Sequence, residues 1–191
     1  AIFLNSFSEF SGLNSLNKVS KEEYFRRIFI VLEKINQVSG VNVAIKLHPR
    51  ETHYQDYVNL IKERSLSPVT IHPPNLSREE FYSLINNADC FVHFGSNAAL
   101  EAMIIDRPVV TLDLIGDIYP IDHWLYGIDT STAALEVSIY GNIKEVILQA
   151  FEDNSTLKKN RAQIVDQCCG PIDGNSSRRV VDLISRLASD L

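Results

Sequence analysis

Short apolar runs alternate with amphipathic stretches along most of this chain. The apolar runs predict five strands, at residues 1–7, 41–49, 69–74, 90–94 and 107–114. Several of them are apolar at nearly every position, as expected for strands whose two faces are both covered. In the stretches between them, apolar residues recur every three or four positions, which predicts helices. These helices are expected at residues 21–38, 54–65 and 78–87, around Glu101, and at 142–153, 156–168 and 176–189.

Two of the predicted helices begin with a capping-box pattern, in which Ser is followed three residues later by Glu. Ser20 with Glu23 precedes the first helix, and Ser77 with Glu80 precedes the third. In this motif each side chain accepts a hydrogen bond from the backbone of the other residue, which fixes the start of the helix. Residues 115–138 show neither the apolar run of a buried strand nor the three-to-four-residue spacing of a helix, and they are expected to be irregular.

The alternation of strands and helices predicts the fold class. Strand–helix–strand units with right-handed crossovers build a doubly wound α/β fold with a mostly parallel sheet, here of about five or six strands. The 191 residues, 45% of them hydrophobic, are enough to bury the core of one domain of ordinary size. We therefore expect a single Rossmann-like α/β domain over residues 1–191.

The net charge and the cysteine content indicate which partners and which cellular compartment to expect. The net charge is −6 and no run of Lys or Arg stands out, which argues against nucleic acid as a partner. The three cysteines show no disulfide-like spacing, which favours a reducing compartment. No window approaches the ~18 consecutive apolar residues that a membrane-spanning helix needs.

Polar and small residues follow the predicted strands at one edge of the sheet. Ligands of parallel α/β sheets bind outside the carboxyl ends of the strands. The strand ends bring Ser6, Ser8, Glu9, Lys46, His48, Pro49, Arg50, Gly95, Ser96, Asn97 and Asp113 to that edge. Of these, the candidate ligand contacts are Ser6, His48, Arg50, Gly95, Ser96 and Asn97. They follow three different strands, so the fold is expected to gather them into one site.

The turn after the fourth strand reads Gly95-Ser96-Asn97. Gly95 permits a close approach of the backbone to a ligand, and Ser96 or Asn97 can cap the helix that follows. A phosphate is stabilised at such a helix start by free N–H groups. Ordinary helix capping explains the same three residues, so the turn alone leaves both interpretations open.

His48 makes anion binding the favoured interpretation. The motif KLHPRE places its imidazole between Lys46 and Arg50 at the end of the second strand, where it can donate to a phosphoryl oxygen. A surface His in a polar loop is the alternative, but two candidate anion-binding elements fall on the same sheet edge. Glu101 lies five residues after Ser96, where it either accepts hydrogen bonds from ribose hydroxyls or only complements the helix dipole.

Several well-known motifs are missing from the sequence. It contains no G-x-G-x-x-G, no Walker loop, no G-x-S-x-G and no Asp-x-Asp pair. No cluster of His, Cys and acidic residues has convincing metal-ligand spacing. The sequence therefore predicts neither a cofactor nor a metal, and it identifies no catalytic residue.

Three stretches resemble a known family, namely KLHPRE, NNADCFVHFGSNAALEAMIIDRPVVTLD and DGNSSRRVVDLI. With the intervening sequence they span most of residues 41–190 and resemble the C-terminal, nucleotide-binding half of GT-B glycosyltransferases. The chain looks similar to bacterial and archaeal enzymes of surface polysaccharide synthesis. These include capsule and sialic-acid-type transferases and the CDP-glycerol transferases of teichoic acid synthesis.

The resemblance implies roles for the candidate residues. In such families the His of the His-Pro motif, here His48, and the Ser after the fourth strand, here Ser96, contact the nucleotide phosphate. The Glu in the following helix, here Glu101, often holds the ribose. Many retaining members carry a second Glu eight residues earlier, where this chain has His93, so a retaining reaction is less expected and an inverting one stays open.

The resemblance also implies partners and a setting for the chain. The ligand would be a nucleotide-activated sugar of the CMP, CDP, UDP or GDP type, bound without a metal. A missing N-terminal domain of similar size would bind the acceptor and commonly supply the catalytic base. Because the chain begins within a predicted strand and without Met, it is expected to be part of a longer protein and inactive alone. The implied location is the cytoplasm, with peripheral attachment of the full-length protein to the inner face of the membrane left open.

Three interpretations stand at this point. The first is the donor-nucleotide-binding domain of a metal-independent glycosyltransferase for surface carbohydrate. The second shares the fold and much of the pocket, and is half of a CDP-glycerol-type phosphotransferase or of a UDP-sugar 2-epimerase. The third is a non-catalytic α/β module that binds a sugar or a protein.

Overall fold

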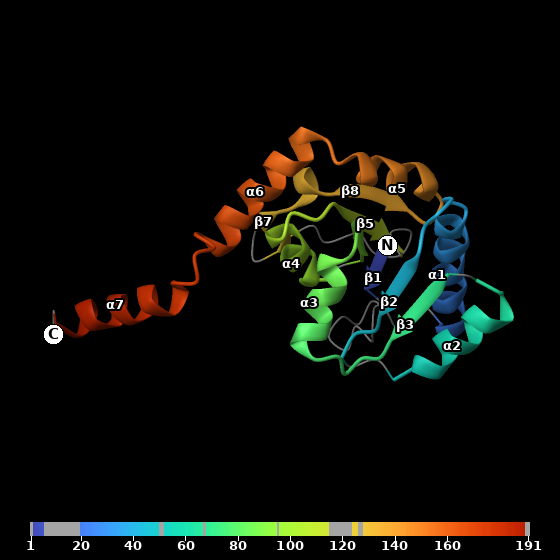
Figure 1. Ribbon diagram of the computed structural model, residues 1–191, viewed down its shortest axis with the longest axis horizontal. Coiled ribbons are helices and arrows are strands. Elements are labelled where there is room, and N and C mark those ends of the chain that lie inside the picture. Colours follow the sequence, from blue (N-terminus) through green and yellow to red (C-terminus); the bar gives the residue numbers. More distant parts are fainter. Residues whose placement is uncertain are drawn as a thin grey trace.

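Six parallel strands form the main sheet of the protein. The computed structural model describes residues 2–5, 20–49, 52–66, 68–94, 96–114, 124–125 and 128–189. The strands of the main sheet are β1 (Ile2–Asn5), β2 (Val43–Lys46), β3 (Val69–His72), β4 (Cys90–His93), β5 (Val109–Asp113) and β8 (Leu135–Ser138). They lie in the order β3-β2-β1-β4-β5-β8, and all neighbouring pairs run parallel (Figure 1). A separate antiparallel pair joins β6 (Trp124–Leu125) to β7 (Ile128–Asp129).

Helices cover both faces of the main sheet. The helices are α1 (Lys21–Asn36), α2 (Tyr54–Glu63), α3 (Arg78–Asn86), α4 (Ala98–Ile104), α5 (Ile143–Glu152), α6 (Ser155–Cys169) and α7 (Ser176–Ser189), with a short 3-10 helix, η2 (Ser131–Ala133). Apolar side chains of α1, α2 and α5 pack in one hydrophobic core, and those of α3, α4 and α6 pack in a second. Figure 1 shows α1 and α2 on one side of the sheet and α3 and α4 on the other.

Strand β4 shows how the sheet separates the two cores. All four of its residues are buried, as its apolar run predicts. Cys90 and Val92 contribute to the core with α1 and α5, whereas Phe91 contributes to the core with α4 and α6. This alternation follows from the two-residue period of a strand, and it places the His93 side chain on the same face as Phe91.

The structure confirms most elements that the sequence predicts, including two helix starts. Ser20 accepts a hydrogen bond from the Glu23 N–H at 3.2 Å at the start of α1. Both halves of the capping box are present between Ser77 and Glu80 at the start of α3. The prediction of a doubly wound, mostly parallel α/β sheet is confirmed, with six strands in the main sheet.

The expectation of irregular structure over residues 115–138 is wrong at several places, because the paired strands β6 and β7, the 3-10 helix η2 and the strand β8 all form there. β8 is an edge strand of the main sheet. This edge strand pairs in parallel with β5, with Val110 opposite Leu135 and Leu112 opposite Val137. The segment LEVS is not an apolar run and only Val137 among its residues is buried, so its pattern does not indicate a strand.

The strand order places the reversal of the sheet between β1 and β4. The chain runs from β1 outward through β2 to β3 and then returns to β4 on the other side of β1. In doubly wound sheets, ligands bind outside the carboxyl ends of the strands at this reversal. The segments that leave β2 and β4, after Lys46 and His93, are thus positioned for ligand binding.

The buried side chain of Arg161 on α6 links the residues that follow α4 and α5. The Arg161 guanidinium is 1% exposed and donates to both carboxylate oxygens of Asp153, at 2.8 and 2.7 Å, and to Asp106 at 2.8 Å. Asp106 follows α4 and Asp153 follows α5, and both have positive φ, of 56° and 37°. The ion pairs therefore hold two left-handed turns, which are unfavourable for residues with a side chain.

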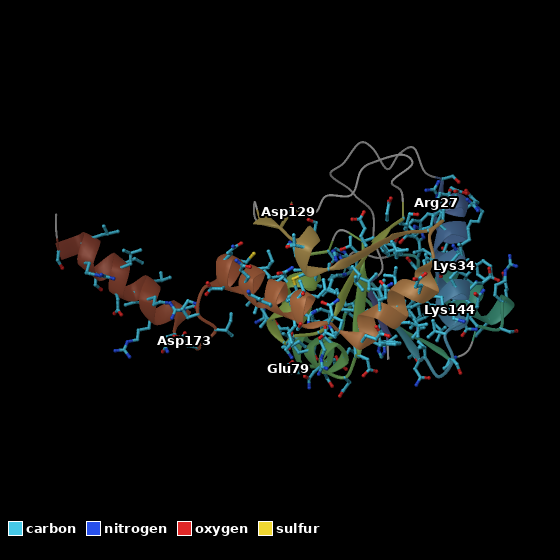
Figure 2. All side chains as sticks on the ribbon, turned by 90° about the horizontal axis from the view of Figure 1, so that it is seen from above. Arg27, Lys34, Glu79, Asp129, Lys144 and Asp173 are labelled. Atoms are coloured by element: carbon cyan, nitrogen blue, oxygen red, sulfur yellow. The ribbon has the colours of Figure 1, made fainter. Side chains whose placement is uncertain are left out.

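Helix α7 extends away from the rest of the structure, as Figures 1 and 2 show. None of its side chains is buried. Its exposed large apolar residues are Val180, Val181, Leu183, Ile184 and Leu187. Asp173, labelled in Figure 2, lies just before the helix and accepts from the Arg179 guanidinium at 2.8 Å. Among the described helices, none combines the length and apolar character that crossing a membrane requires.

Candidate functional site

A cavity of about 360 Å³ opens at the carboxyl edge of the main sheet. It is bounded by the segment after β2, the start of α3, and the turn between β4 and α4. Its polar side chains are Lys46, His48, Ser77, Arg78, Tyr82, Ser96 and Glu101, and its apolar lining is Pro49, Pro74, Leu76, Phe81 and Ala98. The volume falls within the range of about 300–1,000 Å³ that is typical of small-molecule sites.

Lys46 is the strongest indication that this cavity binds an anion. It is the last residue of β2, its side chain lines the cavity, and only 7% of its surface is exposed. Within the described part of the chain no carboxylate lies within ion-pair distance of its ammonium, which sits 5.7 Å from the centroid of the Phe81 ring. Burial lowers the pKa of this ammonium from its ordinary value of 10.5, an effect that Glu101 opposes. A buried cation without a counter-ion is costly, and a bound anion would supply one.

The turn after β4 brings Ser96 to the same cavity. The Ser96 Oγ accepts a hydrogen bond from the Ala98 N–H at 3.2 Å, at the start of the seven-residue helix α4. The Ser96 N–H donates in turn to Nδ1 of His93 at 3.2 Å. These two bonds fix the orientation of Ser96, the residue for which the sequence predicts a phosphate contact.

Glu101 and Tyr82 bring an acceptor and a hydroxyl to the cavity from two helices. Tyr82 lies on α3, and its hydroxyl donates to Oε1 of Glu101 on α4 at 3.4 Å. The bond is long and exposed, so the hydroxyl groups of a ligand can compete for the carboxylate. An ionised carboxylate accepts from several donors at once, as recognition of a sugar diol requires.

Three of the predicted site residues, His48, Ser96 and Glu101, lie together in the cavity. Asn97 is exposed, its side chain makes no capping bond with α4, and it does not line the cavity. The capping bond comes from Ser96 instead. The remaining predicted residues lie outside the described part of the chain, and these are Ser6, Arg50 and Gly95.

Four other polar residues line the cavity, namely Lys46, Ser77, Arg78 and Tyr82. The sequence places Lys46 at this edge of the sheet but not among the candidate ligand contacts, and it gives no indication of the other three. Lys46 carries a usable signal, because it is the one charged residue in the otherwise apolar run VAIKL. The other three approach through the connection between β3 and α3 and through α3 itself, which only the assembled fold brings to the end of β2.

The donor and acceptor groups of the cavity suit a phosphorylated ligand that also carries hydroxyl groups. An ammonium, an imidazole and a hydroxyl can donate to phosphoryl oxygens, and a carboxylate can accept from hydroxyls. Among the residues that the structure describes, no group of three or more His, Cys, Asp or Glu is placed to hold a metal ion. The arrangement fits a nucleotide or a sugar phosphate better than an apolar ligand.

The order of the parallel strands defines a Rossmann-like fold. Comparison with solved structures identifies proteins that share this fold. No protein-family model and no curated protein matches the chain. A structure assigned as UDP-N-acetylglucosamine 2-epimerase from Listeria monocytogenes matches with a TM-score of 0.62 at 13% identity, over 100% of this chain and 46% of that one. MnaA from S. aureus, in a structure with UDP, matches with a TM-score of 0.54 at 15% identity, over 100% and 45%. A trehalose-6-phosphate structure from E. coli, bound with UDP-2-fluoro glucose, matches with a TM-score of 0.55 at 14% identity, over 95% and 43%.

These neighbours, together with TarM and OtsA, have the fold of GT-B glycosyltransferases. Identities this low show the fold alone, and the fold is that of one Rossmann-like half of a GT-B protein. The chain spans less than half the length of each of these structures. The resemblance seen in the sequence is therefore confirmed at the level of the fold.

Proposed function

We propose that this chain is the donor-nucleotide-binding domain of a GT-B glycosyltransferase that builds surface carbohydrate without a metal. The observation that carries the proposal is the cavity at the sheet edge, where the buried Lys46 lies with His48, Ser96 and Glu101. Neighbours with the same fold have been solved with UDP or a UDP-sugar, which supports a nucleotide-activated sugar as the ligand. The candidate nucleotides are CMP, CDP, UDP and GDP.

The proposed nucleotide lies with its phosphate between the ends of β2 and β4. Lys46 neutralises the phosphate charge, while His48 and the Ser96 hydroxyl donate to its oxygens. Glu101 accepts from the ribose hydroxyls, and Tyr82 orients the carboxylate through the hydrogen bond that it already makes. Each group therefore meets the part of the ligand whose charge and hydrogen-bonding capacity it complements.

The proposed catalytic contribution of this domain is to stabilise the departing nucleotide. Negative charge develops on the leaving phosphate in the transition state, and preorganised donors in a site poor in water stabilise that charge. Lys46 is already desolvated before the ligand arrives, so it needs little reorganisation. The acceptor site and the catalytic base belong to a second, N-terminal domain in this proposal, so the chain alone binds nucleotide without turnover.

Isothermal titration calorimetry of the chain with CMP, CDP, UDP and GDP tests the proposal. At least one nucleotide is expected to bind, and His48→Ala and Ser96→Ala should each weaken that binding by about 10-fold, the effect of one lost hydrogen bond to a charged group. The proposal fails if no nucleotide binds at millimolar concentration. Unchanged affinity in both variants would favour the non-catalytic sugar- or protein-binding module.

A UDP-sugar 2-epimerase is the second candidate, because UDP-GlcNAc 2-epimerases are among the structural neighbours. An epimerase and a transferase of this fold share the nucleotide pocket, so nucleotide binding does not separate them. Product analysis with the full-length protein does, because an epimerase converts a UDP-sugar alone, whereas a transferase requires an acceptor. A CDP-glycerol-type phosphotransferase is recognised by transfer of glycerol phosphate from CDP-glycerol to an acceptor, with release of CMP.

Replacing Glu101 by Gln is expected to weaken UDP binding by about 5- to 10-fold while leaving pyrophosphate binding unchanged or slightly tighter. The amide is a weaker acceptor for ribose hydroxyls, whereas loss of a negative charge near Lys46 favours an anion. Calorimetry with UDP and with inorganic pyrophosphate measures both effects. Glu79→Gln, at an exposed position of α3 outside the cavity, is the matched control and should bind both ligands normally. Equal weakening of UDP and pyrophosphate binding by Glu101→Gln would contradict the ribose contact.

A further inference from the structure

His93 is buried beneath the Ser96 turn and is not part of the cavity wall. It is the last residue of β4, with 7% of its surface exposed, and its ring stacks on Phe91 with the centroids 6.0 Å apart. Its Nδ1 lies 3.2 Å from the Ser96 nitrogen, and its Nε2 lies 3.2 Å from Oγ1 of Thr111 on β5. The ring therefore links the turn to the neighbouring strand.

These two contacts determine which ring nitrogen carries the proton. A backbone N–H can only donate, so Nδ1 of His93 must be the acceptor and must be unprotonated. The proton of the neutral imidazole is then on Nε2, which donates to the Thr111 hydroxyl. The opposite tautomer would direct a ring N–H at the Ser96 N–H, and the hydrogen bond to the turn would be lost.

We propose that His93 is a positioning residue of the anion site, which holds the Ser96 hydroxyl toward the cavity through its neutral Nε2–H tautomer. The inference rests on the proposed function, because it assigns to Ser96 a contact with the ligand phosphate. His93 binds the N–H of Ser96 while the Ala98 N–H binds its Oγ, so the residue is held from two sides. The hydroxyl hydrogen is then the donor that Ser96 directs to a phosphoryl oxygen. His93 thus acts on the site from behind the turn without touching the ligand.

Two variants distinguish the effect of losing the His93 hydrogen bond from the effect of changing the volume of its side chain. Leu and Asn have the same branched shape, but only Asn carries an acceptor oxygen at the position of Nδ1. His93→Leu is expected to weaken UDP binding by about 3- to 10-fold, the effect of one lost positioning hydrogen bond. His93→Asn is expected to bind UDP within about twofold of the wild-type protein. Both variants lose the bond to Thr111, so comparing them cancels its effect.

The tautomer of the ring is a second readout, and it needs no ligand. Nitrogen-15 spectra of the imidazole side chains in the wild-type protein are expected to show an unprotonated Nδ1 and a protonated Nε2 for His93. A protonated Nδ1 would overturn the proposal. This measurement still decides if His93→Leu fails to fold.

The outcomes distinguish this inference from the proposed function. Wild-type UDP affinity in His93→Leu, or the same loss in His93→Leu and His93→Asn, overturns the positioning role and leaves nucleotide binding intact. Failure of the wild-type protein to bind any of the four nucleotides overturns the proposed function and the role of His93 with it. Melting temperatures of both variants show whether a loss of affinity reflects the site or the fold.

Discussion

Replacing Lys46 by Met is expected to weaken UDP binding by about 10- to 100-fold and to stabilise the protein without ligand. A charge-assisted hydrogen bond to a phosphate is worth roughly 1.5–3 kcal/mol, which gives this range of affinity. The stability rises because Met occupies the space beside Phe81 without a buried charge. We expect the free energy of unfolding to increase by about 1 kcal/mol. Calorimetry with UDP and urea unfolding measure the two effects.

Lys34→Met is the matched control for this substitution. The Lys34 ammonium donates to the carbonyl oxygens of Ile139 and Gly141, at 2.7 and 3.0 Å, and does not line the cavity. Its loss is expected to lower stability by about 1 kcal/mol and to leave UDP affinity unchanged. The role of Lys46 would be contradicted if Lys46→Met kept its affinity or became less stable than the wild-type protein.

The pH dependence of stability gives an independent check on the buried charge. Burial lowers the pKa of Lys46 in the folded state, whereas the unfolded chain keeps the ordinary value of 10.5. Below the lowered pKa, Lys46 is charged in both states, and burial of the charge destabilises the folded state by its full cost. As the pH rises from that pKa toward 10.5, the folded state loses the proton and this cost disappears. The wild-type protein should gain stability relative to Lys46→Met over that alkaline window, as measured by urea unfolding at increasing pH.

Replacing Arg161 by Met is expected to lower the free energy of unfolding by about 2–3 kcal/mol. Removing one partner of a buried ion pair costs about 3–5 kcal/mol when the remaining charge stays buried. Here the Asp153 and Asp106 side chains are 22% and 41% exposed, so water and Lys158 partly compensate their carboxylates. Both aspartates also lose the group that holds their left-handed turns. The urea midpoint is expected to fall by about 1 M.

Arg26→Met tests whether burial is the cause of that loss. Arg26 forms an ion pair with Glu23 at 2.6 Å, but its side chain is 53% exposed. Exposed ion pairs contribute little after solvent screening, so the expected change is below about 0.5 kcal/mol. Losses of the same size in Arg26→Met and Arg161→Met would contradict the assignment of Arg161 as a buried structural cation.

The fold is largely predictable from the sequence because most of its elements are specified locally. The apolar runs and the Ser77–Glu80 capping box each define an element within a few residues. β8 is not predictable in this way, because its pairing with β5 makes it a strand more than its own four residues do. The same limit applies to Arg161, whose partners Asp153 and Asp106 lie 8 and 55 residues away.

The candidate site is predictable where its residues directly follow a strand or lie on the helix that begins there, as Glu101 does. His48 and Ser96 are of this kind, because the rule for carboxyl ends of parallel strands selects them. Tyr82 is not, because its approach depends on how α3 crosses the sheet. Lys46 is visible in the sequence as the one charged residue of its strand, but its burial is not, because a lysine at the end of a strand normally reaches solvent and is covered here only once α3 brings Phe81 beside it.

The isolation of α7 has a consequence for its own folding. A helix of 14 residues that stands alone is close to the shortest length that is stable in water, about 12–15 residues. With no side chain of α7 buried, the enthalpy of its hydrogen bonds must offset the backbone entropy without help from packing. The helix content of this segment is therefore expected to rise when its exposed valines, leucines and isoleucine pack against another surface. Circular dichroism would measure that rise as an increase in helical ellipticity.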